Sequence, residues 1–460
     1  MNNDIKYKEQ ISDKGNFWFI ENIDQELYEF LSTAEKKARI DYLVTGNMLR
    51  KSIEHIVGKI LESEGLDTQI DANAPLKTQL RLLKERSLLP SLPKVKYMNC
   101  ENKLTTSNWD VFIRYFGNTI SHINQKPFYP RLDDTNAVMA VRIMYDFVRL
   151  YYKYIIPPGL PGFQENLMPI ADYHITNAYK PKDADRTGCV REFEAYLKNS
   201  AGKEAFHAII RMYRREDLDS NFITRNNDVF IEASKVSLTC VPDGMTRIEE
   251  VSKEDNTTHY IISYIFNRKP YPLTNEILQS ADLKSRLQLA LRIAESINKL
   301  HNSMVPIYHR ALSYESIYVD KFMGQLIPYI IKFDFAKIKT GYLGTVIANA
   351  MQAKELIKEQ RVLKYVAPEW AQAKLSDNHK DIDWAKVDIY SLGVLIYDIS
   401  TGRFAKNRIG ETELELLEDE FGFSADFVDM LELCLSDDPS WRPDIDRICN
   451  VLREEIKRWN

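Results

Sequence analysis

The first third of the chain repeats apolar residues with the period of an α-helix. Apolar side chains recur three or four positions apart within 27–38, 49–61 and 76–89, a spacing that places them on one face of each helix. The pattern predicts a further helix over 136–154. We therefore expect an all-helical bundle over residues 1–156.

A cluster of backbone-restricting residues ends this pattern. The run Ile156-Pro157-Pro158-Gly159-Leu160-Pro161-Gly162 combines three prolines with two glycines, which interrupt both helices and strands. We predict a linker over 157–168 and a second domain over 169–460.

The second domain begins with strand-like segments and continues with helical ones. Segments 173–178, 189–197, 206–213 and 259–262 are rich in β-branched and aromatic residues. Apolar positions return to helical spacing over 287–301. Strands followed by helices indicate an α+β fold.

Composition narrows the class of protein. The chain has 460 residues, 44% of them hydrophobic and 28% charged, as in ordinary globular proteins. Its formal net charge of −5 provides no global basic field that would attract nucleic acid. Five cysteines without a Cys-x-x-Cys pair favour reduced thiols in the cytoplasm. No apolar run reaches the ~18 residues of a membrane helix, and the start lacks an apolar signal core, so we expect no membrane association.

Five motifs in the second domain occur in the order of the protein-kinase motifs. They match, in turn, the catalytic loop, the magnesium loop, the end of the activation segment, a buried central helix and a late arginine: His309-Arg310-Ala311, Asp334-Phe335-Ala336, Ala367-Pro368-Glu369, Asp388-Ile389-Tyr390-Ser391-Leu392-Gly393 and Asp438-Pro439-Ser440-Trp441-Arg442-Pro443. Residues 169–460 thus resemble a protein kinase domain. The resemblance implies a bilobal architecture, with an N-lobe over 169–267 and a C-lobe over 268–460.

The motifs keep their structural residues and lose most catalytic ones. The resemblance implies that Glu369 pairs with Arg442 and that Asp388 anchors the catalytic loop. Ala311 stands in place of the catalytic aspartate and Ser316 in place of the magnesium-binding asparagine. Ser313 likewise replaces the loop lysine. A methyl group cannot accept a proton, a step that contributes roughly 10²–10⁴-fold to catalysis, so we predict no catalytic residues.

The resemblance also assigns a nucleotide site. Arg211 takes the place of the phosphate-binding lysine, Glu232 that of its ion-pairing glutamate, and Ile262 that of the gatekeeper. The hinge falls at Ser263 and Ile265, with Tyr264 between them. The loop over 179–188 has one glycine instead of a spaced set. ATP and Mg²⁺ are the implied ligands, and weak binding is expected, with Asp334 and Ser316 as the implied metal ligands.

The first domain resembles the helical domains called HEPN-like. The resemblance lies in Met48-Leu49-Arg50-Lys51-Ser52-Ile53-Glu54, in 82–90 and in 116–122. Active members of that group cleave RNA with an arginine and a histidine, which implies an RNA site formed by Arg114, Asn118 and His122. These residues are four apart and would share one stripe of a helix. Members also commonly form homodimers. In the alternative that we favour, His122 packs in the bundle and Arg114 is solvated or pairs with a carboxylate such as Glu54.

Three functions remain open. The first is a pseudokinase that regulates or scaffolds a protein partner, in which Glu232, Phe335 and the activation segment switch between conformations. The second is a weak or atypical protein kinase that uses another carboxylate, and the third is an RNA-cleaving effector regulated by the kinase-like domain. The HEPN resemblance alone suggests a bacterial defence role.

Overall fold

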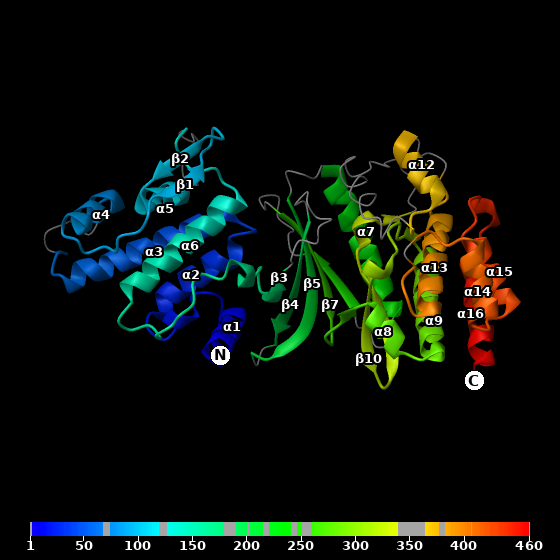
Figure 1. The fold of residues 1–460 in the computed structure, drawn as a ribbon. Coiled ribbons are helices and arrows are strands. Elements are labelled where there is room, and N and C mark those ends of the chain that lie inside the picture. Colours follow the sequence, from blue (N-terminus) through cyan, green and yellow to red (C-terminus); the bar gives the residue numbers. More distant parts are fainter. Residues whose placement is uncertain are drawn as a thin grey trace.

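The computed structural model arranges the chain in three consecutive parts (Figure 1). A mostly helical part comes first, a β-sheet follows, and a second helical part ends the chain. The model describes residues 2–67, 74–118, 127–178, 190–199, 202–214, 220–240, 246–250, 259–338, 364–376, 382–405 and 407–459. None of the described helices combines the length and apolar character that a membrane-spanning helix requires.

The N-terminal helices follow the predicted apolar periodicity. They are α1 (Asn2–Lys14), α2 (Gln25–Lys37), α3 (Tyr42–Ser63), α4 (Leu76–Glu85), α5 (Trp109–Asn118) and α6 (Asp134–Tyr151). Asp24 and Asp41 begin α2 and α3, because each carboxylate accepts hydrogen bonds from backbone N–H groups of the first turn. The apolar faces meet in one core that includes Leu27, Leu49 and Phe112.

The prediction of an all-helical first domain is wrong in one respect. Residues Val95–Met98 (β1) and Leu104–Ser107 (β2) form an antiparallel hairpin. Val95 and Tyr97 are buried while Lys96 is exposed, the alternation expected of a half-buried strand. Four residues are too few for this pattern to stand out in a sequence of helices.

The proline-rich segment packs against the first domain. Leu160 and Met168 belong to the core of the helical part, and the Tyr145 hydroxyl donates to the carbonyl of Pro161 at 2.6 Å. Asn16 accepts a hydrogen bond from the N–H of Gln164 and donates from Nδ2 to the carbonyl of the same residue. Residues 157–168 therefore pack against the first domain, and their assignment as a linker between two domains stays a prediction.

Five antiparallel strands form the central sheet in the order β3-β4-β5-β7-β6. Their bounds are His174–Ala178 (β3), Val190–Lys198 (β4), Glu204–Arg214 (β5), Thr246–Glu250 (β6) and His259–Phe266 (β7). Helix α7 (Ser220–Cys240) connects β5 to β6 and carries Glu232. The four predicted strands are confirmed, although β7 continues beyond Ile262.

The two faces of this sheet bury different parts of the protein. Ile210, Ile261 and Ile265 on one face form a small core with Ile40, the residue before the Asp41 cap of α3. The Arg39 guanidinium lies 5.6 Å from the centre of the Phe193 ring on the same face. At the β3 edge the Ser12 hydroxyl donates to the carbonyl of Ile175. The first domain therefore covers one face of the sheet.

The opposite face of the sheet joins the core of the C-terminal part. This core contains side chains of α7 and of the long helices α9 (Leu283–His301) and α13 (Trp384–Thr401). The remaining elements are β8 (Tyr271–Pro272), α8 (Asn275–Ser280), β9 (Ile307–Tyr308), η4 (Tyr314–Ser316), β10 (Ile317–Phe322), β11 (Gln325–Ile330), η5 (Phe333–Phe335), β12 (Lys337–Ile338), α12 (Pro368–Ser376), α14 (Glu411–Asp419), α15 (Ala425–Cys434), η6 (Pro439–Trp441) and α16 (Ile445–Arg458). Mixed helix and sheet confirm the α+β class. The domain bounds at 156, 168 and 267 remain predictions.

We expect the contact between the first domain and the sheet to stabilise the protein. Ile40 is 4% exposed, so Ile40→Ala removes buried methyl groups and lowers the free energy of unfolding by about 2–4 kcal/mol. Leu43→Ala is the control, because Leu43 is 37% exposed and its truncation should cost well under half as much. Guanidinium unfolding measures both variants. Equal losses would show that Ile40 contributes no more than a surface residue.

A buried carboxyl group in the first domain predicts a dependence of stability on pH. Burial raises the pKa of Glu35 from 4.5 to about 7, against the hydrogen bonds from Asn16 that favour the carboxylate. The folded state then binds more protons than the unfolded state between these two values. Stability should therefore fall by about 3 kcal/mol as the pH rises from 4.5 to about 7.

The variant Glu35→Gln should lose this pH dependence, because an amide does not titrate in this range. Denaturant unfolding of both proteins at several values between about pH 4.5 and pH 8 measures the difference. The same fall in stability in both proteins would exclude Glu35 as its source.

Candidate functional site

The catalytic-loop motif is held by Asp388 on the buried helix α13. Its two carboxylate oxygens accept backbone N–H groups of His309 and Arg310, both at 2.7 Å. The same carboxylate lies 3.0 Å from Nε2 of His301 at the end of α9. His309 also connects the catalytic loop to the segment before Asp334, because its Nε2 lies 2.9 Å from the carbonyl oxygen of Ile331. The predicted anchoring role of Asp388 is confirmed.

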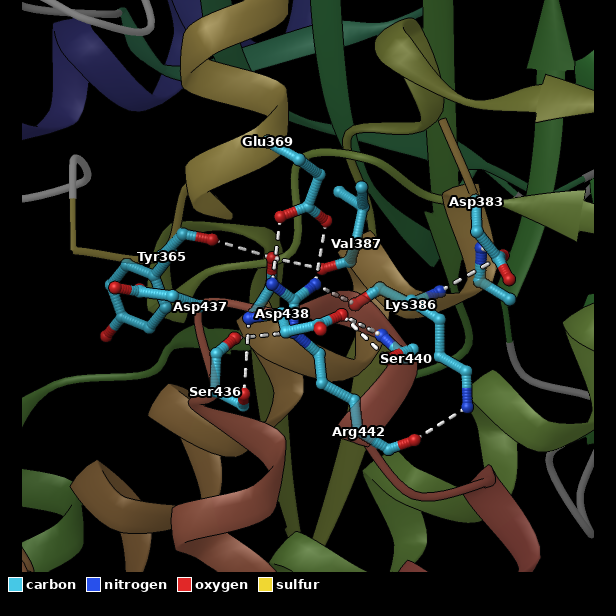
Figure 2. Close-up of polar contacts among 12 residues, drawn as sticks. Tyr365, Glu369, Asp383, Lys386, Val387, Ser436, Asp437, Asp438, Ser440 and Arg442 are labelled. Atoms are coloured by element: carbon cyan, nitrogen blue, oxygen red, sulfur yellow. Dashed lines mark hydrogen bonds and ion pairs between the residues drawn. The ribbon is translucent and has the colours of Figure 1, made fainter. Parts of the chain in front are cut away.

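A second predicted contact fixes the end of the activation segment. Arg442 donates from both terminal nitrogens to the two oxygens of Glu369, at 2.7 and 2.8 Å (Figure 2). The guanidinium also donates to the carbonyls of Ser436 and Lys386. Arg442 is 2% exposed, and two parallel hydrogen bonds set its orientation. Both contacts that the kinase resemblance implied, Asp388 with the catalytic loop and Glu369 with Arg442, are thus present; we call these contacts the kinase-like frame.

The loop that follows Ala311 uses its polar side chains to form its own turn. The Ser316 hydroxyl accepts the N–H of Ser313 at 3.0 Å and donates to the carbonyl of the same residue at 2.7 Å. These two bonds close η4 and bury Ser316 completely. The Ser316 hydroxyl, which we assigned to magnesium, therefore stabilises the loop itself.

Asp334 contacts a cation that belongs to the protein. Nε of Arg211 on β5 donates to Asp334 Oδ2 at 2.6 Å, and the Tyr264 hydroxyl donates to Oδ1 at 3.4 Å. Asp334 is 1% exposed and Arg211 is 8% exposed. Burial opposes the charged guanidinium, yet Asp334 and Glu192 hold the pKa of Arg211 well above its usual value. The result is a buried ion pair at the position expected to bind metal.

Three further side chains complete this buried cluster. Arg211 donates from Nη1 to Glu192 on β4 at 2.5 Å and from Nη2 to the Tyr213 hydroxyl at 3.3 Å. The Tyr318 hydroxyl donates to the other oxygen of Glu192 at 3.3 Å. Burial raises the pKa of Tyr264 well above its usual range, so its hydroxyl keeps its proton. We call Glu192, Arg211, Tyr213, Tyr264, Tyr318 and Asp334 the Arg211 cluster.

The predicted partner of Arg211 is wrong. Glu232 on α7 instead pairs with Lys235 of the same helix at 2.6 Å. The prediction assumed that Arg211, which takes the position of the kinase lysine, turns toward α7. Arg211 turns toward Asp334 and Glu192 instead, because the buried carboxylate of Asp334 and the partly buried one of Glu192 lie within reach of its planar guanidinium.

The predicted hinge also needs correction. Ser263 and Ile265 lie within β7, which pairs with β5 on one side and β6 on the other through Phe266. Their side chains belong to the face that meets the first domain, where the Ser263 hydroxyl donates to the carbonyl of Glu249. Strand pairing on both sides uses the backbone groups that a hinge would offer to a ligand.

Tyr264 is the side chain of β7 that reaches the Asp334 loop. Ile262, the predicted gatekeeper, is fully buried beside Arg211 in the strand register. Tyr264 lies two residues further and accepts the N–H of Phe333 at 2.8 Å. Sequence reasoning missed Tyr264 and Glu192. The alternation of side chains along β7 could have identified Tyr264, since it shares a face with Ile262.

The arrangement does not fit a bound magnesium ion. Mg²⁺ requires about six oxygen ligands in near-octahedral geometry, whereas the two oxygens of Asp334 face Arg211 and Tyr264. No group of three or more metal-binding side chains occurs among the described residues. The side chain of Phe335 and the loop over 179–188 fall outside the described positions, as does most of the activation segment. In this conformation the guanidinium takes the place of a metal ion.

The predicted RNA residues can be followed only in part. His122 and the Asn118 side chain lie outside the described part of the chain. Arg114 lies with its guanidinium 5.2 Å from the centre of the Tyr115 ring, while Glu54 pairs with Arg50. Helix α5 runs through Gly117, where a β-carbon would approach the Gly46 carbonyl to 3.0 Å. A close contact between helices α5 and α3 therefore explains this glycine. The RNA site and the homodimer remain predictions.

Comparisons with known proteins agree with the kinase-like frame. No family model matches the chain. A protein of Dictyostelium discoideum, named a probable inactive serine/threonine-protein kinase, is 29% identical over 196 residues, which are 40% of this chain and 16% of that protein. Cold-responsive protein kinase 1 of Arabidopsis thaliana is 26% identical over 202 residues, covering 38% of this chain and 46% of the relative.

A dual specificity protein kinase of Dictyostelium discoideum is 25% identical over 177 residues, which cover 37% of this chain and 7% of that kinase. The chain therefore spans less than half the length of these relatives. All three come from eukaryotes and lend no support to a bacterial origin or a defence role. The matches support a protein-kinase-like domain in this chain.

We expect the ion pair between Arg211 and Asp334 to be essential for stability. Asp334→Ala leaves a buried guanidinium without one of its carboxylates and should lower the free energy of unfolding by about 3–5 kcal/mol. Glu232→Ala is the control, since its partly exposed pair with Lys235 should contribute less than about 1 kcal/mol. Denaturant unfolding provides the measurement.

The double variant Arg211→Met/Asp334→Leu tests the origin of the effect. Removing both charges should be less destabilising than Asp334→Ala alone, because no buried guanidinium is left without Asp334, and Glu192, which loses Arg211, is partly exposed and still accepts from Tyr318. The single variants Arg211→Met and Asp334→Leu complete the cycle, and a double variant whose loss equals the sum of their two losses would argue against a coupled pair.

Proposed function

We propose that this protein is a pseudokinase-type regulator or scaffold. Its kinase-like domain is bilobal, transfers no phosphate and fills its nucleotide site with its own side chains. The observation that carries this proposal is the 2.6 Å contact between Arg211 and Asp334, in a chain that has Ala311 in the catalytic loop. The inactive state named for the Dictyostelium relative supports the same conclusion.

Two independent defects separate this chain from an active kinase. Ala311 cannot accept the proton of a substrate hydroxyl. Asp334 cannot hold Mg²⁺ unless Arg211 and Tyr264 first release it. Restoring the catalytic base alone, or freeing Asp334 alone, would leave the other defect in place. We therefore expect the protein to transfer no phosphoryl group.

The alternative of an atypical kinase requires another carboxylate near the catalytic loop. Glu315 is the nearest acidic residue in sequence, and its carboxylate lies 3.2 Å from Nζ of Lys332. This ion pair favours a structural role for Glu315. The alternative of an RNA-cleaving effector depends on His122 and receives no support from the described contacts of Arg114.

A kinase-like domain without catalysis acts through the surfaces that it presents. The Arg211 cluster joins β4, β5 and β7 to the Asp334 loop, and so holds the sheet and the C-terminal part in one arrangement. We propose that a protein partner recognises this arrangement. The first domain, which contacts the same sheet, would move together with it.

The closed site predicts that ATP does not stabilise the wild-type protein. A ligand that binds only the folded state raises its stability by about 2.7 kcal/mol at 100 times the dissociation constant. We expect the unfolding temperature to change by less than about 1 °C with millimolar ATP, with or without Mg²⁺. A rise of several degrees that requires Mg²⁺ and disappears in Asp334→Ala would disprove the closed site.

Phosphotransfer provides a separate test. Purified protein should transfer no label from γ-phosphate-labelled ATP to itself or to general protein substrates, since Ala311 and the occupied Asp334 each block the reaction. An active protein kinase assayed in parallel shows that the assay works. Transfer by the wild type that Asp334→Ala abolishes would refute the proposal.

A further inference from the structure

Arg310 of the catalytic loop packs against two tryptophans. Its guanidinium carbon lies 4.0 Å from the centre of the Trp384 ring and 4.9 Å from that of the Trp370 ring. Arg310 is 7% exposed and adopts a left-handed backbone conformation with φ of 65°. That conformation is uncommon for a residue with a side chain. The backbone of Arg310 thus adopts an uncommon conformation at the point where its guanidinium contacts both indoles.

The two tryptophans come from different segments of the chain. Trp384 is the first residue of α13, and Trp370 follows Glu369 in α12. Their rings meet edge to face, with centres 4.9 Å apart. Through this contact Arg310 connects the catalytic loop to the end of the activation segment and to the central helix.

A second cation lies against the same indole. Nζ of Lys337 is 5.4 Å from the centre of the Trp384 ring. Lys337 belongs to β12, which follows the Asp334 motif and pairs with β9 just before the catalytic loop. Two cations from the two loops of the site therefore converge on one aromatic ring. The electron-rich face of tryptophan attracts cations, by up to ~2 kcal/mol when the contact is desolvated.

In active kinases a phosphate group often performs the corresponding task. Phosphorylation of the activation segment orders it because the new anion pairs with arginine side chains. We propose that Trp384 stands in for such a phosphate. The indole gathers Arg310 and Lys337 permanently, so the end of the activation segment stays docked without phosphorylation.

Neighbouring contacts support a permanently docked segment. The Lys364 ammonium donates to Asp398 of α13 at 2.6 Å, and the Ser391 hydroxyl donates to the carbonyl of Tyr365 at 2.7 Å. With the pair between Glu369 and Arg442, these bonds attach residues 364–369 to the C-terminal helices. This inference concerns the activation segment and is independent of whether the nucleotide site is closed.

Hydrogen exchange of the backbone tests the role of the indole. Trp384→Phe keeps an aromatic face, whereas Trp384→Leu keeps only an apolar side chain. Exchange in residues 364–376 should stay near wild type in the first variant and rise roughly ten-fold in the second. Helix α15 serves as the internal reference for global unfolding. Equal exchange in both variants would show that Trp384 contributes only apolar packing, and it would overturn the proposal.

A second pair of variants covers the case in which position 384 tolerates no change. Arg310→Lys keeps the cation and should protect residues 364–376 as the wild type does, whereas Arg310→Leu should raise their exchange roughly ten-fold. Similar exchange in these two variants would show that the charge is irrelevant and would contradict the proposal.

Rescue by an anion tests the comparison with phosphate. In Trp384→Ala, inorganic phosphate should restore protection of residues 364–376, and chloride at the same ionic strength should not. The wild type should respond to neither salt. No difference between phosphate and chloride in the variant would show that the indole does not occupy an anion site.

Discussion

The buried ion pair between Arg211 and Asp334 is the constraint on which the kinase-like part depends. A carboxylate that is 1% exposed must have a compensating charge, because the cost of removing it from water is several kcal/mol. A metal ion with bound nucleotide could supply that charge, and here a guanidinium on β5 supplies it instead. The arginine therefore stabilises the site, and under the proposed function it also opposes the binding of a metal ion there.

The Arg211 cluster also explains how the first domain and the site are connected. On β4, Glu192 faces the cluster while the next residue, Phe193, lies against Arg39 of the first domain. Successive residues of a strand point to opposite faces. One strand therefore contacts both parts. A displacement of the first domain along the sheet would shift β4 and with it the carboxylate of Glu192, which pairs with Arg211. The proline-rich segment packs in the core of the first domain and leads directly to β3 of the same sheet.

The retained motifs and the replaced ones serve different physical tasks. Asp388, Glu369 and Arg442 satisfy buried backbone groups and charges, so replacing any of them would leave a polar group without a partner. At the positions of Ala311 and Ser316 only catalysis requires a carboxylate or an amide, so the fold persists with a methyl group at one and a hydroxyl that closes its own turn at the other. This difference accounts for a kinase-like frame that persists although Ala311 and Ser316 replace residues of the catalytic motif.

The sequence by itself determined the N-terminal helices, four strands of the central sheet, the kinase-like motifs and the replacement of the catalytic aspartate by Ala311, because each depends on local periodicity or on residues at motif positions. It also identified Asp388, Glu369, Arg442 and Asp334 as the residues that matter. Only the tertiary structure decided which partner each charge selects. Glu192 and Tyr264 come from separate strands and carry no motif, and the orientation of Arg211 depends on which carboxylates the folded sheet brings within reach. The contact of Ile40 with the sheet likewise arises from docking of two separate segments, a long-range event that no local pattern records.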